Sequence, residues 1–388
     1  MGVTLNVILF FFAAYSFLRL FSDSKIYCTI YTFTILAFIS YIPSLRYALF
    51  MVHPEIGMLS CVLIAITSLI KEKFLFSGIF CAAAAMFKQT GVIFVPLILL
   101  ILILDFLKDK NFISLIKNFT YFFLGFTIIA IPIVIFILLN SRLEGVINNI
   151  WIVHANAPKT RSLTDCVIPE LSLNLFYLIV LLILSIFAFM LLRYKKESFP
   201  SKPLLICLMA AVIAFPFVIS SAKLPGADSN AYAPLLFFLI FSFSAMIFWT
   251  FSKFNKLGLI ILFISSTTLF LPLKGDSHFF LWKNSASKNA LNILRSNYNI
   301  ESYFPWQAGA HLTVNGKPVP SGDGIFYEIQ AGLKRGSVGL PQSGYVFTRK
   351  YGGIYPSWIK FQGEETSVPF YSEKELFTCF KYGESKDH

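Results

Sequence analysis

Long apolar runs, each close to the length of a membrane-crossing helix, recur through residues 1–273. A bilayer core of about 30 Å is crossed by roughly 20 apolar residues in helical conformation. The runs are continuous rather than alternating, which favours helices over a β-barrel. We therefore predict an all-α polytopic membrane domain with about ten transmembrane helices. The predicted spans are Val3–Leu18, Ile26–Leu45, Pro54–Ile70, Phe74–Phe87, Gly91–Leu107, Tyr121–Asn140, Leu171–Leu192, Pro203–Ser220, Tyr232–Trp249 and Leu257–Leu273.

The composition agrees with this class. Hydrophobic residues make up 56% of the chain and charged residues 13%, against about 25% charged in soluble domains. The formal net charge of +12 raises the question of nucleic-acid binding. Many of the basic residues, however, fall in short connections between spans, which is a topology signal. We expect membrane lipids and no nucleic acid among the partners.

Those basic connections alternate along the chain, which orients the spans. By the positive-inside rule they are cytoplasmic. The amino terminus and the tail after Leu273 are then extracytoplasmic, in a protein of the cell (inner) membrane. The residues concerned are Arg19, Lys25, Lys71, Lys73, Lys108, Lys110, Lys117, Arg193, Lys195, Lys196, Lys202, Lys253 and Lys256.

Lys88 interrupts an almost wholly apolar segment that runs from Phe74 to Leu104. An ionisable group at such a depth is costly and usually faces a polar cavity or a partner. A single helix here would place Lys108 outside, against the charge rule. Two short spans that meet at Lys88-Gln89-Thr90 keep it inside, so we predict a break there. Lys88 could alternatively extend to the outer headgroups.

The predicted outer side carries cations where the charge rule expects few, which points to an anionic ligand. Lys and Arg both hold phosphate groups, Arg with two parallel hydrogen bonds. A lipid-linked phosphate is the natural candidate. Pro54 and Glu55 also suit an ordinary helix start. The ionisable residues on this side are Arg46, His53, Glu55, Lys88, Arg142, His154, Lys159, Arg161 and Lys223.

Residues 274–388 form a predicted second domain, a small extracytoplasmic α/β domain. Asn284–Asn297 has the periodicity of an amphipathic helix. Asn315-Gly316 indicates either a hairpin turn or the end of a helix. Short strands are predicted at ESYFPW, GYVFT and WIKFQ. Cys166 and Cys379 both lie outside the membrane on this topology, and a disulfide between them is one alternative.

Four pieces of sequence resemble the bacterial polytopic glycosyltransferases of the GT-C superfamily, the group of protein mannosyltransferase-like and aminoarabinose transferase-like enzymes. The first piece is Arg46 through His53-Pro54-Glu55, and the second is LFSGIFCAAAAMFKQTGVIFVPLILLI around Lys88. The third is SSAKLPGADSNAYAPLL, and the fourth is YFPWQAGAHLTVNGKPVPSGDGIFYEIQAG. The resemblance implies six substrate-binding candidates: His53, Glu55, Lys88, Lys223, Asp228 and Asn230.

The resemblance implies transfer of a sugar from a polyprenyl-phosphate donor to a lipid or glycan acceptor outside the membrane. The family's general base is an Asp in the first outer loop. Here Asp23 is the only early acid and is predicted inside, so the catalytic residue is unassigned and Glu55 is the nearest acidic candidate. We expect Met1 to stand where the family's second span begins, so either the start is called too late or the chain is a truncated remnant, and an inactive chain is an alternative to an active transferase.

Other classes stay open. The sequence lacks Asp-x-Asp, HExxH, GxxxxGK[ST] and GxGxxG, which disfavours nucleotide-driven chemistry. No cofactor is assigned, no metal ligands are identified, and a divalent metal ion is left open. A lipid-linked sugar transporter or flippase is the first alternative, although no second interrupted span pair is visible. An inactive scaffold for a partner transferase is the second.

Overall fold

The computed structural model describes residues 2–50, 54–140, 162–194, 201–223 and 229–253, together with four short strands in the tail. The chain divides into two compact units. Met1–Gly145 and Lys159–Leu271 form one unit, and Val146–Pro158 and Pro272–His388 form the other. The described part of the first unit is helical, whereas the described elements of the second are strands. The predicted boundary at residue 273 lies outside the described residues.

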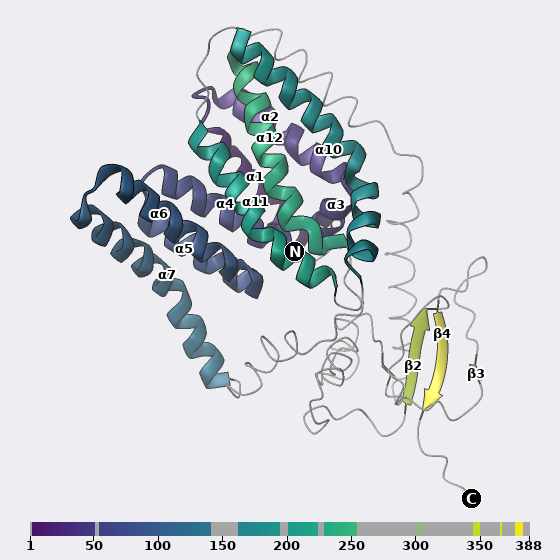
Figure 1. The fold of residues 1–388 in the computed structure, drawn as a ribbon. Helices are drawn as coiled ribbons and strands as arrows, with labels where there is room; N and C mark the ends of the chain where they lie inside the picture. The colour runs from purple at the N-terminus through teal and green to yellow at the C-terminus, as the bar shows by residue number, and fades with distance from the viewer. Residues whose placement is uncertain are drawn as a thin grey trace, which may run out of the picture. The chain divides into compact units, whose positions relative to one another are not determined.

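The first unit is a bundle of helices (Figure 1). Two 3-10 helices accompany the α-helices, η1 over Gln89–Phe94 and η3 over Ser229–Tyr232. The α-helices are α1 Gly2–Leu18, α2 Lys25–Tyr41, α3 Pro43–Phe50, α4 Glu55–Ile70, α5 Phe74–Phe87, α6 Val95–Asp109, α7 Phe112–Asn140, α10 Leu163–Tyr194, α11 Ser201–Ala222 and α12 Ala233–Lys253.

Five helical segments of this unit are long and apolar enough to cross a membrane. They are Gln89–Asp109, Phe112–Leu139, Asn174–Tyr194, Ser201–Ala222 and Ala233–Thr250. Shorter apolar helices occupy Thr4–Leu18, Lys25–Tyr41, Glu55–Ile70 and Phe74–Phe87. The predicted helical class is thus confirmed for the described part of this unit, and these five apolar segments suggest a membrane-embedded protein. The count of ten spans stays a prediction, and Leu257–Leu273 lies outside the described residues.

The predicted span Ile26–Leu45 is divided in the structure. Helix α2 ends at Tyr41, and α3 begins at Pro43. Between them Ile42 is extended, with φ −78° and ψ 116°, and its N–H donates to the Ile39 carbonyl at 3.2 Å. Proline disfavours helical backbone in the residue before it and suits the first position of a new helix. Pro43 therefore accounts for the division.

The basic residues in the described connections gather at one end of the bundle. Asp105 of α6 forms an ion pair with Lys202 of α11 at 2.8 Å. Arg19 lies near Lys71. The end of α12 meets the beginning of α2, where the Tyr31 and Phe248 rings are 4.9 Å apart. We call this the basic end. Its residues are Arg19, Lys25, Lys71, Lys73, Lys108, Lys110, Lys202 and Lys253.

The basic residues in the described connections therefore share one end, as the alternation in the sequence predicts. Which side of the membrane that end faces stays a prediction. The opposite end holds the start of α4, the link between α5 and η1, and the end of α11, which contacts η1. We call it the Lys88 end.

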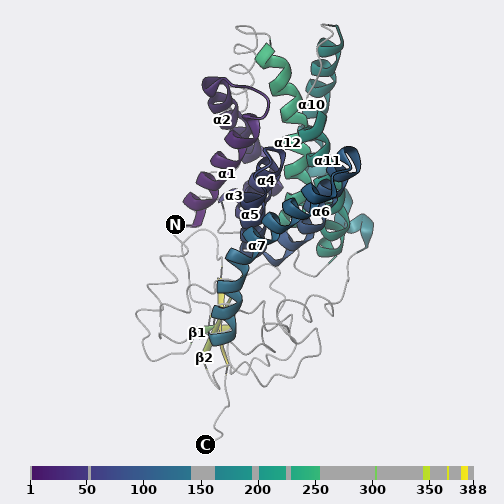
Figure 2. The same ribbon diagram turned by 90° about the vertical axis from the view of Figure 1, so that its left-hand side faces the viewer.

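The described strands of the second unit form one sheet. They are β1 Ser302–Tyr303, β2 Gly344–Arg349, β3 Glu365–Thr366 and β4 Phe377–Tyr382, in the order β1-β2-β4-β3. The β1–β2 pair, seen in Figure 2, is parallel, and the other two pairs are antiparallel. The strand predicted at GYVFT is confirmed as β2, and β1 lies within ESYFPW.

Other predictions for the tail cannot be compared with the structure. Asn284–Asn297, Asn315-Gly316 and WIKFQ lie outside the described residues, so the α/β class of the tail stays a prediction. Cys379 lies on β4 opposite Phe347 of β2. The side chain of Cys166 is outside the described part, so the disulfide is likewise untested.

Helices α5 and α7 cross in direct backbone contact through two glycines. A Cβ atom added to Gly78 would lie 2.0 Å from the Phe122 carbonyl oxygen. A Cβ atom added to Gly125 would lie 2.0 Å from the Leu75 carbonyl oxygen. These contacts are with backbone atoms, which cannot move away by a change of rotamer as a flexible side chain can. The close approach of α5 and α7 therefore requires both glycines.

We predict that Gly125→Ala destabilises the protein by about 1–3 kcal/mol, as expected for overpacking. Helix propensity alone predicts the opposite sign, a gain of about 1 kcal/mol for Ala over Gly. The measurement is thermal unfolding of the detergent-solubilised chain. Ile128→Ala, at a position of α7 that is 49% exposed, is the control and should leave the melting temperature nearly unchanged. A Gly125→Ala protein as stable as the parent would contradict the close crossing.

Candidate functional site

Glu55 is the first residue of α4, directly after Pro54. Pro54 caps the helix with φ −74° and ψ −8°, and its carbonyl accepts the Met58 N–H at 2.9 Å. The helix dipole favours an acidic residue at this end. Although an acid at a helix start is usually solvated, the Glu55 side chain is only 2% exposed. The carboxylate is therefore held inside the protein.

Lys88 lies where the apolar segment breaks, at the place the sequence predicts. Helix α5 ends at Phe87, and Lys88 is extended with φ −155° and ψ 133°. The Lys88 N–H donates to the Ala84 carbonyl at 3.2 Å, and the Lys88 carbonyl accepts from the Gly91 N–H at 2.8 Å. The chain then enters η1. Because Lys88 is outside both helices, its side chain can leave the apolar run.

The Lys88 side chain pairs with Glu55. The Lys88 Nζ atom donates to Glu55 Oε1 at 2.5 Å, which joins the start of α4 to the α5–η1 link. A second contact alongside it runs from Thr90 Oγ1 to Met58 Sδ at 3.4 Å. The Lys88 side chain is 31% exposed. The pair thus combines a buried carboxylate with an ammonium that also reaches the surface.

Two glycines allow close contacts around the pair, Gly57 between α4 and the end of α5, and Gly91 between η1 and α5. A Cβ atom on Gly57 would lie 2.6 Å from the Phe87 ring and 3.2 Å from Asn6 Oδ1. A Cβ atom on Gly91 would lie 2.5 Å from the Ala84 carbonyl oxygen. Sequence reasoning missed both glycines and the buried Asn6, because nothing local indicates which distant segment packs on them.

The other predicted site residues are placed less completely. Lys223 follows α11 at the Lys88 end, half-buried, and its N–H donates to the Ile219 carbonyl at 3.3 Å. Asn230 lies in η3, which contacts α3 and α11, but its side chain is outside the described part. His53 and Asp228 also lie outside the described residues. The structure therefore joins Glu55 to Lys88 and brings the backbones of Lys223 and Asn230 to the same end.

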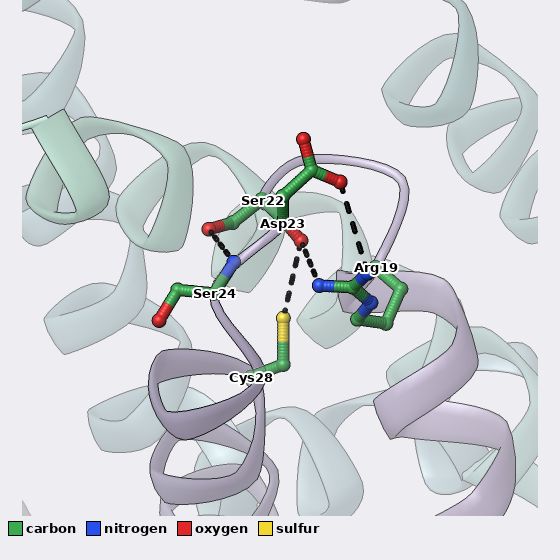
Figure 3. Close-up of polar contacts among 5 residues, drawn as sticks. All are labelled: Arg19, Ser22, Asp23, Ser24 and Cys28. Atoms are coloured by element: carbon green, nitrogen blue, oxygen red, sulfur yellow. Dashed lines mark hydrogen bonds and ion pairs between the residues drawn. The ribbon is translucent and has the colours of Figure 1, made fainter.

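Asp23, the only early acid, lies at the opposite end, in the turn between α1 and α2 (Figure 3). Its fully exposed carboxylate is 3.7 Å from Arg19 Nη2. Arg19 Nη1 donates to the Ser22 carbonyl at 3.1 Å, and Cys28 Sγ contacts the same oxygen at 3.5 Å. Asp23 thus belongs to the basic end and is remote from the Glu55–Lys88 pair.

Comparison with other proteins does not identify the function of this site. No protein family, curated protein or solved structure matches this chain. Within the described ranges, no three His, Cys, Asp or Glu side chains form a group that could hold a metal ion. What the site can do chemically is therefore argued from the pair itself, an oriented cation with donors left for an anion.

We predict that Lys88→Met destabilises the protein more than Glu55→Gln does. Removal of Lys88 leaves a carboxylate at a position where it is only 2% exposed, and breaking a buried pair costs roughly 3–5 kcal/mol. Removal of the carboxylate leaves an ammonium that already reaches the surface, at a cost of about 1 kcal/mol. Thermal unfolding of both variants in detergent measures the difference. If the two variants lost equal stability, or if Glu55→Gln lost more, the result would contradict the conclusion that Glu55 is more deeply buried than Lys88.

Proposed function

We propose that this chain is a membrane glycosyltransferase that moves a sugar from a polyprenyl-phosphate donor to a lipid or glycan acceptor. The Lys88 end would bind the phosphate of the donor. The observation that carries the proposal is the Glu55–Lys88 pair, in which a 2% exposed carboxylate holds a 31% exposed ammonium. The resemblance of the surrounding segments to GT-C enzymes supplies the reaction class.

The pair suits the charge that develops in this reaction. As the glycosidic bond to phosphate breaks, negative charge grows on the departing lipid phosphate. A cation already oriented toward that position stabilises the transition state without reorganisation. The Lys88 ammonium has three donor hydrogens, of which one goes to Glu55 Oε1. Further donors remain for phosphate oxygens.

Glu55 has a positioning role in this proposal. Its burial and its bond to Lys88 make it a poor acceptor of a proton from a sugar or lipid hydroxyl, because a general base must reach the reacting group. We assign it instead to hold the Lys88 side chain in place. The general base stays unassigned, and His53 and Asp228 remain candidate binding residues by resemblance alone.

Two further features support a lipid-linked donor, the position of Lys88 at a helix end and the side of the membrane that the charge rule predicts for it. Lys88 is at the end of α5, where a headgroup phosphate would lie, and Lys223 follows α11 at the same end. The positive-inside rule turns the basic end toward the cytoplasm. The Lys88 end would then be extracytoplasmic, on the side where we propose that the tail also lies, in the cell inner membrane.

The test is release of polyprenyl phosphate from labelled polyprenyl-phosphate sugars, with host membrane extract as the acceptor source and the purified full chain in proteoliposomes. We expect transfer by the parent and a loss of about 10²–10³-fold in Lys88→Met, the range for removing one preorganised donor. Lys88→Arg should retain part of the activity. Lys108→Met, an exposed lysine at the basic end, is the matched control and should transfer normally. Unchanged transfer by Lys88→Met would remove the proposal.

A carrier for the same lipid-linked sugar is the second candidate, favoured by the interrupted helix. Discontinuous helices with an irregular link often form the substrate sites of secondary transporters, and α5 and α6 are separated by extended Lys88 and η1. The same proteoliposomes separate these functions. A carrier moves label across the bilayer without releasing lipid phosphate, and an inactive scaffold does neither.

A further inference from the structure

We propose that the two turns at the basic end that join α1 to α2 and α4 to α5 form a binding site for the headgroup of an anionic phospholipid. The ligand is an amphiphile with a negatively charged phosphate, and the probe is phosphatidylglycerol. The site does not depend on the proposed function, because it lies at the opposite end of the bundle.

The two turns converge at the basic end. Helix α1 packs against α4, and a Cβ atom on Gly57 near the start of α4 would lie 3.2 Å from Asn6 Oδ1 near the start of α1. The two helices therefore run in the same direction, and the turns that follow them are neighbours. The α4–α5 turn is tight: the Glu72 N–H donates to the Leu69 carbonyl at 2.9 Å and the Lys73 N–H to the Ser68 carbonyl at 2.8 Å. Glu72 adopts φ 58°, an uncommon conformation for a residue other than glycine. This turn fixes the backbone on either side of Lys71.

The converging turns carry a surplus of positive charge. Partial burial lowers the pKa of Lys71, and the nearby charges of Lys73 and Arg19 lower it further. Such mutual repulsion is relieved when an anion binds between the cations. A phosphate group, which takes charge-assisted hydrogen bonds from Lys and Arg, is the anion that fits.

The acidic residues of the same turns do not cancel this charge. Asp23 is fully exposed, and its carboxylate is 3.7 Å from Arg19 Nη2, longer than the 2.7–2.9 Å or so of a strong charge-assisted bond. Glu72 is exposed at the turn tip. The two turns contain the cations Arg19, Lys25, Lys71 and Lys73 against the acids Asp23 and Glu72, a surplus of two positive charges.

Apolar surface next to these cations favours a lipid over a free phosphate ion. Ile26, beside Lys25, is 70% exposed, and Phe76, three residues after Lys73, is 52% exposed. Farther along α2, Phe33 is 55% exposed. Cations at the helix ends and apolar side chains along the same helices match a phosphate headgroup and its acyl chains.

The test compares lipid binding to the full chain in mild detergent by native mass spectrometry, with phosphatidylglycerol and phosphatidylcholine as probes. The site variant is Arg19→Gln/Lys71→Gln/Lys73→Gln. The matched control is Lys108→Gln/Lys110→Gln/Lys117→Gln, which removes three lysines from the α6–α7 region. We expect at least tenfold preference of the parent for phosphatidylglycerol, a fivefold or greater loss in the site variant, and a change below twofold in the control.

Equal losses of phosphatidylglycerol binding in both triple variants would overturn the proposal, because they would show that the lipid is attracted by positive charge anywhere on the basic end. So would equal binding of the two lipids by the parent. Inorganic phosphate at millimolar concentration is the third probe, and displacement of the lipid by it would overturn the lipid assignment.

A melting experiment guards against a folding defect in the triple variant. Lys71→Gln relieves repulsion from Lys73 and Arg19, so without lipid its melting temperature should equal or exceed that of the parent. Added phosphatidylglycerol should raise the melting temperature of the parent more than that of Lys71→Gln, because a ligand stabilises the state it binds. An equal rise in both proteins would overturn the role of Lys71.

Discussion

A carboxylate kept from water is the constraint on which the rest of this bundle depends. Desolvation of an ion costs several kcal/mol and is offset only by a close partner of opposite charge. Glu55 meets this requirement through Lys88, and the requirement shapes the structure around the pair. The start of α4 must lie against the end of α5. Gly57 leaves room for that approach, because a Cβ atom there would lie 2.6 Å from the Phe87 ring. Gly91 serves a different contact, in which η1 folds against the Ala84 backbone of α5.

The same pair explains why the apolar segment from Phe74 to Leu104 is not one helix. An unbroken helix would carry Lys88 near its centre, among lipid tails or packed apolar side chains. With the break, Lys88 stands at a helix end and reaches both Glu55 and the surface. The break also sets the direction of α6, which returns toward the basic end, where its Asp105 meets Lys202.

The sequence predicts those features that depend on local chemistry. It places the break at Lys88 and the ends of α5 at Phe74 and Phe87, because apolar length and alternating basic connections are readable without a partner. It does not predict that Glu55 pairs with Lys88, since the two are 33 residues apart and each has an ordinary explanation alone. It does not predict the division of α2 from α3 either, although Pro43 is a local signal for such a division within the apolar stretch Ile26–Leu45.

The glycines at helix crossings show a different limit of prediction from sequence. Gly78 and Gly125 lie in apolar runs and look like neutral spacers, although each nearly touches the backbone of the facing helix. Their meaning depends on the three-dimensional partner. Strand β4 was missed for a related reason, because its sequence FTCFKY lacks a regular apolar–polar alternation and is identified as a strand by its pairing with β2.

The two ends of the bundle hold positive charge in physically different ways, and this difference bears on function. Lys88 is oriented by a buried carboxylate, so its ammonium occupies a defined position before any ligand arrives, as electrostatic stabilisation of a reaction requires. Lys71 has neighbours of its own sign, and the exposed Asp23 balances Arg19 only weakly. A bound anion stabilises a cluster of that kind by relieving the repulsion among its cations. The proposed chemistry at the Lys88 end and the proposed lipid binding at the basic end can therefore be tested separately, because the charges at each end are set by different residues.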